Sequence, residues 1–68
     1  MNLNNKEFHN KYSNMLDQKV RVTLNSDYVI NGYFNNEFYE DNSILINNGT
    51  LVTIKIEAIK SIELLEEK

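Results

Sequence analysis

The chain has 68 residues, with 7 Lys or Arg against 10 Asp or Glu and a formal net charge of −3. A chain of this length forms one small domain, which buries only about 60% of its unfolded surface and is marginally stable alone. Because it has no cysteine and a single histidine, disulfides, thiolate metal sites and histidine clusters are excluded, and oligomerisation remains as the source of extra stability.

The sequence shows no charged segment followed by an apolar stretch, and no run near the roughly 20 apolar residues of a membrane helix. We therefore expect a cytoplasmic protein with no membrane contact. Basic residues are unevenly placed, because residues 1–21 hold four of them and residues 22–54 hold none. Phosphate affinity comes mainly from Lys and Arg, so this asymmetry bears on nucleic-acid binding.

Residues 5–16 have the pattern of an amphipathic helix. Asn4 can cap its first turn, and Glu7 stands at the capping-box position. Apolar residues then recur at helical spacing: Phe8, Tyr12, Met15 and Leu16. The other face is polar: Lys6, His9, Asn10 and Asn14.

Residues 19–25 and 27–36 predict two strands joined by a cluster of turn-forming residues. The first alternates apolar with polar residues: Val20, Val22 and Leu24 against Lys19, Arg21 and Thr23. In the second, Gly32 indicates a bend or a close backbone approach. This strand either ends near Glu37 or continues through Phe38.

Two segments rich in β-branched residues, 43–47 and 50–56, flank Asn48-Gly49. This dipeptide is the strongest short hairpin signal, because a type I′ turn needs positive φ at both central positions. A two-residue loop here pairs Ile46 with Leu51.

That register leaves apolar residues on both faces of the hairpin. One face carries Leu45, Val52, Ile54 and Ile56, and the other carries Ile44, Ile46 and Leu51. An isolated small domain cannot leave both faces in water, so each face needs a cover.

The C-terminal segment has two interpretations. Ala58, Ile59, Ile62 and Leu65 have near-helical spacing. Alternatively, residues 57–59 form one tight turn and residues 60–65 form a fifth strand, which is the interpretation we adopt. A helix followed by four or five strands with short loops must curl into a small barrel to bury one face.

These residues resemble the Sm-like family, including its bacterial Hfq branch. The resemblance covers about residues 5–65 and consists of the leading helix, Val20-x-Val22-x-Leu24, Ile30-Asn31-Gly32, Asn42, Ile44-Leu45-Ile46 and Ile54–Ile62. It implies a mainly β fold: a short N-terminal α-helix followed by a strongly bent five-stranded antiparallel small barrel of the SH3 type.

The resemblance also implies a homo-oligomeric ring of six or seven subunits, in which the fourth strand of one subunit pairs with the fifth strand of the next. Head-to-tail pairing that closes by rotation gives a ring and covers otherwise exposed strand edges. The residues expected at this interface are Leu51, Thr53, Ile54, Ile62 and Leu64.

The function implied by the resemblance is binding of single-stranded RNA, U-rich or A-rich. The candidate RNA-binding residues are Tyr39, Asn42, Phe38, Lys6, Lys11 and Asn48. Aromatic side chains stack on bases, at about 1–3 kcal/mol per base, an amide can bond a base edge, and lysines contact phosphate.

The alternative is a non-catalytic Sm-like oligomer that sequesters a small nucleotide-type ligand or docks a protein partner without RNA. It is motivated by the lysine-free middle of the chain and by the acidic loop of Glu37, Glu40 and Asp41. These carboxylates have no accompanying base or nucleophile, so we expect no enzyme activity. We likewise expect no cofactor and no metal.

Overall fold

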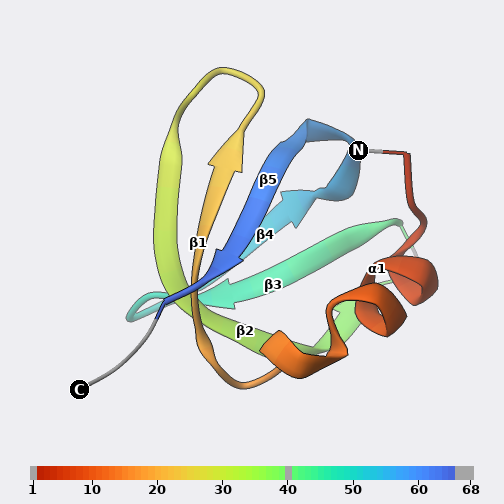
Figure 1. Ribbon diagram of the computed structural model, residues 1–68, viewed down its shortest axis with the longest axis horizontal. Helices are drawn as coiled ribbons and strands as arrows, with labels where there is room; N and C mark the ends of the chain where they lie inside the picture. The colour runs from red at the N-terminus through yellow and green to blue at the C-terminus, as the bar shows by residue number, and fades with distance from the viewer. Residues whose placement is uncertain (1, 40, 66–68) are drawn as a thin grey trace.

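The computed structural model describes residues 2–39 and 41–65, with the side chains of Phe38 and Tyr39 left outside the description. Within this part, one short α-helix precedes five strands, so the fold is mainly β (Figure 1). The elements are α1 (Asn5–Lys11), the 3-10 turn η1 (Ser13–Met15), β1 (Lys19–Leu24), β2 (Val29–Tyr39), β3 (Ser43–Asn47), β4 (Leu51–Lys55), the 3-10 turn η2 (Ile56–Ala58) and β5 (Ile59–Leu64). Among these residues, no helix has the length and apolar character needed to cross a membrane.

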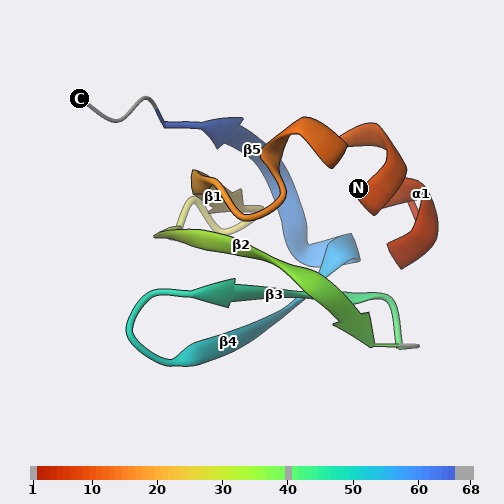
Figure 2. The ribbon, with the colours of Figure 1, turned by 90° about the horizontal axis from the view of Figure 1, so that it is seen from below.

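The five strands form one antiparallel sheet in the order β4-β3-β2-β1-β5. Figure 2 shows β2 passing between the β3–β4 hairpin on one side and β1 with β5 on the other. In the described part of the chain, β4 and β5 are the two edges and do not pair with each other, so hydrogen bonds do not close the sheet.

The core lies between the inner face of this sheet and α1. Its buried members come from the helix, all five strands and η2: Phe8, Val20, Val22, Phe34, Ile44, Ile46, Ile54, Ile56, Ile59 and Ile62. Phe8 joins helix to sheet, since its ring meets that of Phe34 edge-on with centroids 5.8 Å apart. Such aromatic pairs add to the stabilisation that burial itself provides.

The α-helix is shorter than the predicted 5–16. The capping box is confirmed: Asn4 Oδ1 accepts from the Glu7 N–H at 2.8 Å, and Glu7 Oε1 accepts from the Asn4 N–H at 3.1 Å. The α-helix nevertheless ends at Lys11. Serine and asparagine at positions 13 and 14 are weak helix formers, because their side chains compete for backbone hydrogen bonds. The tighter turn η1 follows instead.

The helical spacing predicts His9 on the polar face of the helix, but its side chain is buried. Its Nδ1 lies 2.9 Å from the Asn5 carbonyl oxygen, and its ring centroid lies 5.2 Å from that of Phe34. The helix therefore turns a wider stripe toward the core than its apolar residues alone indicate.

Of the strands, β2 differs most from its predicted extent. β2 runs to Tyr39, so the alternative in which it continues through Phe38 is confirmed over an end near residue 36, and a register shift between Phe34 and Phe38 accommodates extra residues as a bulge. Its start moves to Val29, because the turn from β1 extends further, with Asp27 at φ 69. At the C-terminus the strand interpretation is confirmed, since η2 leads directly into β5. Both ends of β3 and the start of β1 coincide with the prediction, and the remaining strand ends differ from it by one residue.

The predicted register of the β3–β4 hairpin is wrong by one residue. Asn47 pairs with Leu51, so the loop has three residues, 48–50, and only Gly49 in it has positive φ, at 112°. Asn47 Oδ1 accepts a hydrogen bond from the Gly49 N–H at 3.1 Å, which stabilises this longer loop.

A slip of one residue exchanges the two faces of a strand. Ile44 and Ile46 therefore face Ile54 and Val52 across the inner side of the sheet, while Leu51 is exposed. The hairpin is consequently less apolar on its outer side than the two-residue loop implied.

Candidate functional site

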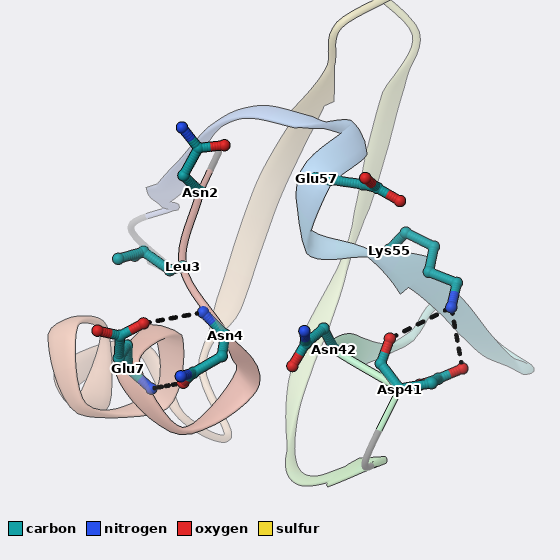
Figure 3. Close-up of a pocket in the computed structure, with 8 residues that line it drawn as sticks. All are labelled: Asn2, Leu3, Asn4, Glu7, Asp41, Asn42, Lys55 and Glu57. Carbon is teal, nitrogen blue, oxygen red and sulfur yellow. Dashed lines mark hydrogen bonds and ion pairs between the residues drawn. The ribbon is translucent and has the colours of Figure 1, made fainter.

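A cleft of about 370 Å³ lies at the helix end of the sheet. Figure 3 shows that it is bordered by the N-terminal segment, the start of α1, the turn after β2, and the junction of β4 with η2. The lining residues are Asn2, Leu3, Asn4, Glu7, Asp41, Asn42, Lys55 and Glu57.

The charged groups of this cleft are mostly acidic. Lys55 Nζ donates to Asp41 Oδ2 and to the Asp41 backbone oxygen, each at 3.2 Å. The nearby Ser43 hydroxyl, and after it Lys55, hold the pKa of the Asp41 carboxyl below its usual value. Three carboxylates therefore line the cleft together with one ammonium group, which is already paired with Asp41. Such a cleft does not favour phosphate, which is bound mainly by unpaired Lys and Arg.

Asn42 connects three elements around this cleft. It adopts φ 61, a left-handed conformation that asparagine tolerates better than most residues. Its Oδ1 accepts from the Asn5 N–H at 3.2 Å, and its backbone oxygen accepts from the Ile56 N–H at 3.0 Å. The predicted base-contacting residue therefore also ties α1 and η2 to the turn between β2 and β3.

The predicted RNA-binding residues do not all come together. Lys6 and Lys11 are exposed on α1, and neither has an ion pair among the described residues. Asn48 is also exposed, but it lies in the β3–β4 loop, which Figures 1 and 2 place at the opposite end of the sheet from α1.

The side chains of Phe38 and Tyr39 lie outside the described part of the structure. Their backbones pair with Ile44 and Ser43, which places both positions at the end of β2 that leads toward Asn42. No stacking geometry is assigned to them.

The predicted interface residues separate into two groups. Leu51 and Leu64, at the ends of the edge strands β4 and β5, are 56% and 42% exposed, and Thr53 is also exposed. Ile54 and Ile62 are buried in the core, so only their backbone is available at a sheet edge.

Sequence reasoning missed one exposed aromatic residue on the sheet. Tyr33 on β2 is 45% exposed and stands directly opposite Lys19 on β1 and Asn47 on β3. Successive side chains of a strand point to opposite faces, so a buried Phe34 already implies that Tyr33 faces outward. Its neighbours, however, follow only from the strand register.

No model of a known protein family matches this chain, and no curated protein matches its sequence.

Proposed function

We propose that this chain is a non-catalytic, Sm-like binding subunit that assembles into a ring through β4 and β5 and binds single-stranded RNA. The observation that carries the proposal is the pair of sheet edges, each bearing an exposed leucine, Leu51 on β4 and Leu64 on β5. Edge strands with exposed apolar residues are natural sites for pairing with another chain.

The two edges complement each other in the manner that a ring requires. They belong to opposite sides of one bent sheet, so β4 of one copy meets β5 of the next and the contact is head-to-tail. A shared sheet would bury Leu51 and Leu64, and it would supply the stability that a 68-residue chain otherwise lacks.

Support for RNA binding comes from the cations of α1. Lys6 and Lys11 point away from the core and have no ion pair in the described part of the chain. One subunit offers only a weak patch, but a ring of six or seven copies presents it repeatedly, and linked weak sites gain effective concentration.

Light scattering on the purified protein tests the assembly. We expect a mass six or seven times that of the chain, and a lower mass for Leu51→Glu, because a carboxylate at the shared edge must be desolvated. Asn31→Glu is the matched control, since Asn31 is exposed and lies on β2, the middle strand of the sheet, rather than on an edge strand. A wild-type protein that stays monomeric at micromolar concentration contradicts the ring.

Fluorescent oligo(U) and oligo(A) titrations at two salt concentrations test RNA binding. We expect affinity to fall with salt, and to fall further in a Lys6→Glu, Lys11→Glu double variant, because phosphate contacts release counterions. A Lys6→Arg, Lys11→Arg double variant serves as control, because it keeps both positive charges on α1. Absence of wild-type binding near physiological salt contradicts the RNA function.

A second candidate is an oligomer that docks a basic protein partner or a small ligand without RNA. It is supported by the acidic cleft, which is lined by Glu7, Asp41 and Glu57 and in which Lys55 is already paired with Asp41. The absorbance ratio of the purified protein, followed by identification of any molecule that co-purifies, distinguishes this candidate from RNA binding.

A further inference from the structure

We infer that the outer face of the sheet holds a base-stacking site for single-stranded RNA centred on Tyr33. This site rests on the proposed RNA function, but it is separate from the lysines of α1 and was not among the residues predicted from sequence. It is defined by the strand register rather than by any motif.

The register aligns four exposed residues across four neighbouring strands. Lys19 of β1 stands opposite Tyr33 of β2, which stands opposite Asn47 of β3, which in turn stands opposite Leu51 of β4. Directly opposed residues share one face of a sheet, with Cβ atoms about 4.5–5.5 Å apart. The row therefore places a cation, an aromatic ring, an amide and an apolar side chain side by side.

This row lies on the face opposite the core. The chain neighbours Val20, Phe34 and Ile46 are all fully buried, whereas the row residues are exposed. Tyr33 stands on β2, the middle strand of the sheet, whose backbone is paired on both sides. The backbone that carries this ring is therefore held on both sides, and tyrosine itself has few rotatable bonds to order on binding, which makes it a suitable stacking surface.

The side chains beside Tyr33 supply the other contacts that a nucleotide needs. Lys19 forms no ion pair within the described residues and is placed to contact phosphate. Asn47 Oδ1 accepts from the Gly49 N–H at 3.1 Å, which leaves the Nδ2 amide group of this exposed side chain as the donor for an acceptor on a base edge. The next cation on this face, Arg21, is neutralised by Glu63 at 3.1 Å.

The composition of the row favours nucleic acid over an apolar partner. Only Leu51 is aliphatic, and it stands at the edge strand, separated from Tyr33 by an amide. An aromatic ring flanked by a cation and an amide is the combination by which sheets hold unpaired bases, stacked on the ring with the backbone on the cation.

Anisotropy of a fluorescein-labelled oligo(U) tests the site with four variants of the full chain. We expect Tyr33→Ala to weaken binding about tenfold, Tyr33→Phe to bind like wild type because the ring is kept, and Tyr28→Ala to have no effect. Lys19→Ala is expected to lower the slope of log affinity against log salt by about one per subunit. Light scattering on the same samples verifies that assembly is unchanged.

The outcomes separate this site from the RNA function itself. If wild type binds and Tyr33→Ala binds equally well, the Tyr33 site is overturned, while binding through α1 stands. If Tyr33→Phe loses as much affinity as Tyr33→Ala, stacking is overturned, because only the hydroxyl matters. If wild type binds neither RNA nor a matched oligo(dT), the site and the proposed function both fail.

Discussion

Tyr33 and Phe34 are consecutive aromatic residues in the middle of β2, yet the sheet gives them opposite surroundings. Phe34 is fully buried against the rings of Phe8 and His9. Tyr33 is 45% exposed, between Lys19 and Asn47. The inner face collects the branched and aromatic side chains of the core, whereas the outer face beside Tyr33 carries a cation and an amide. Stability therefore depends mainly on one face, and the other is free to carry binding.

The largest expected effect comes from exchanging each aromatic residue for alanine. Phe34→Ala removes a fully buried ring and is expected to cost about 3–5 kcal/mol of unfolding free energy, enough to unfold much of a marginal domain. Tyr33→Ala is expected to cost less than about 1 kcal/mol, as for surface substitutions. Urea titrations followed by circular dichroism measure both. Equal losses of unfolding free energy in the two variants would mean that stability does not depend mainly on the inner face.

Gly32 extends the comparison to the backbone of the same strand. A Cβ at this position would meet the Asn47 oxygen and Ile46 Cγ2, each at 2.7 Å. Because one of these atoms belongs to the backbone of β3, Gly32→Ala must push the strands apart, and we expect a loss of about 1–3 kcal/mol. Asn31→Ala, at the exposed neighbouring position, should change stability by less than about 0.5 kcal/mol. Urea midpoints that coincide for the two variants would contradict the close approach.

Much of the inner face was predictable from the sequence, since its signals are local. Alternation placed Val20 and Val22 on one side of β1, and the asparagine and glutamate of the first helical turn specified a capping box. The glycine within β2 indicated the close approach that the structure contains. Each of these predictions depends on residues within a few positions of one another.

The hairpin register was not predictable, because two local interactions compete. Asn48-Gly49 favours a two-residue loop, but the Asn47 side chain bonds the Gly49 N–H and lengthens the loop by one residue. This shift of one residue in the register decides which face Leu51 occupies. It also places Leu51 opposite Asn47, in the row of exposed residues that contains Tyr33. The candidate stacking site therefore depends on long-range pairing, which residue spacing does not encode.

Substitutions of Asn42 measure how much its contact with α1 contributes to the stability of the fold. Asn42→Ala removes the bond to the Asn5 N–H and places a less tolerant residue at φ 61, so we expect a loss of about 1–2 kcal/mol. Asn42→Gly keeps the backbone conformation and removes only the side-chain bond, so its loss should be smaller. Thermal unfolding of both variants separates the two contributions. A glycine variant less stable than the alanine variant would show that φ at this position does not limit stability.

The smallest expected effect is electrostatic and belongs to the exposed turn beside Asn42. The Ser43 hydroxyl and then Lys55 lower the pKa of Asp41 from its ordinary value of 3.8. A carboxylate with a lowered folded pKa adds stability above its unfolded pKa and loses it as pH falls through the folded value.

Asp41→Asn should therefore melt slightly below wild type at neutral pH, and the two melting temperatures should converge below about pH 4. The shift should be small, since Asp41 and Lys55 are each 53% exposed and solvent screens the pair. A difference between the two melting temperatures that widens in acid would reverse the assigned sign.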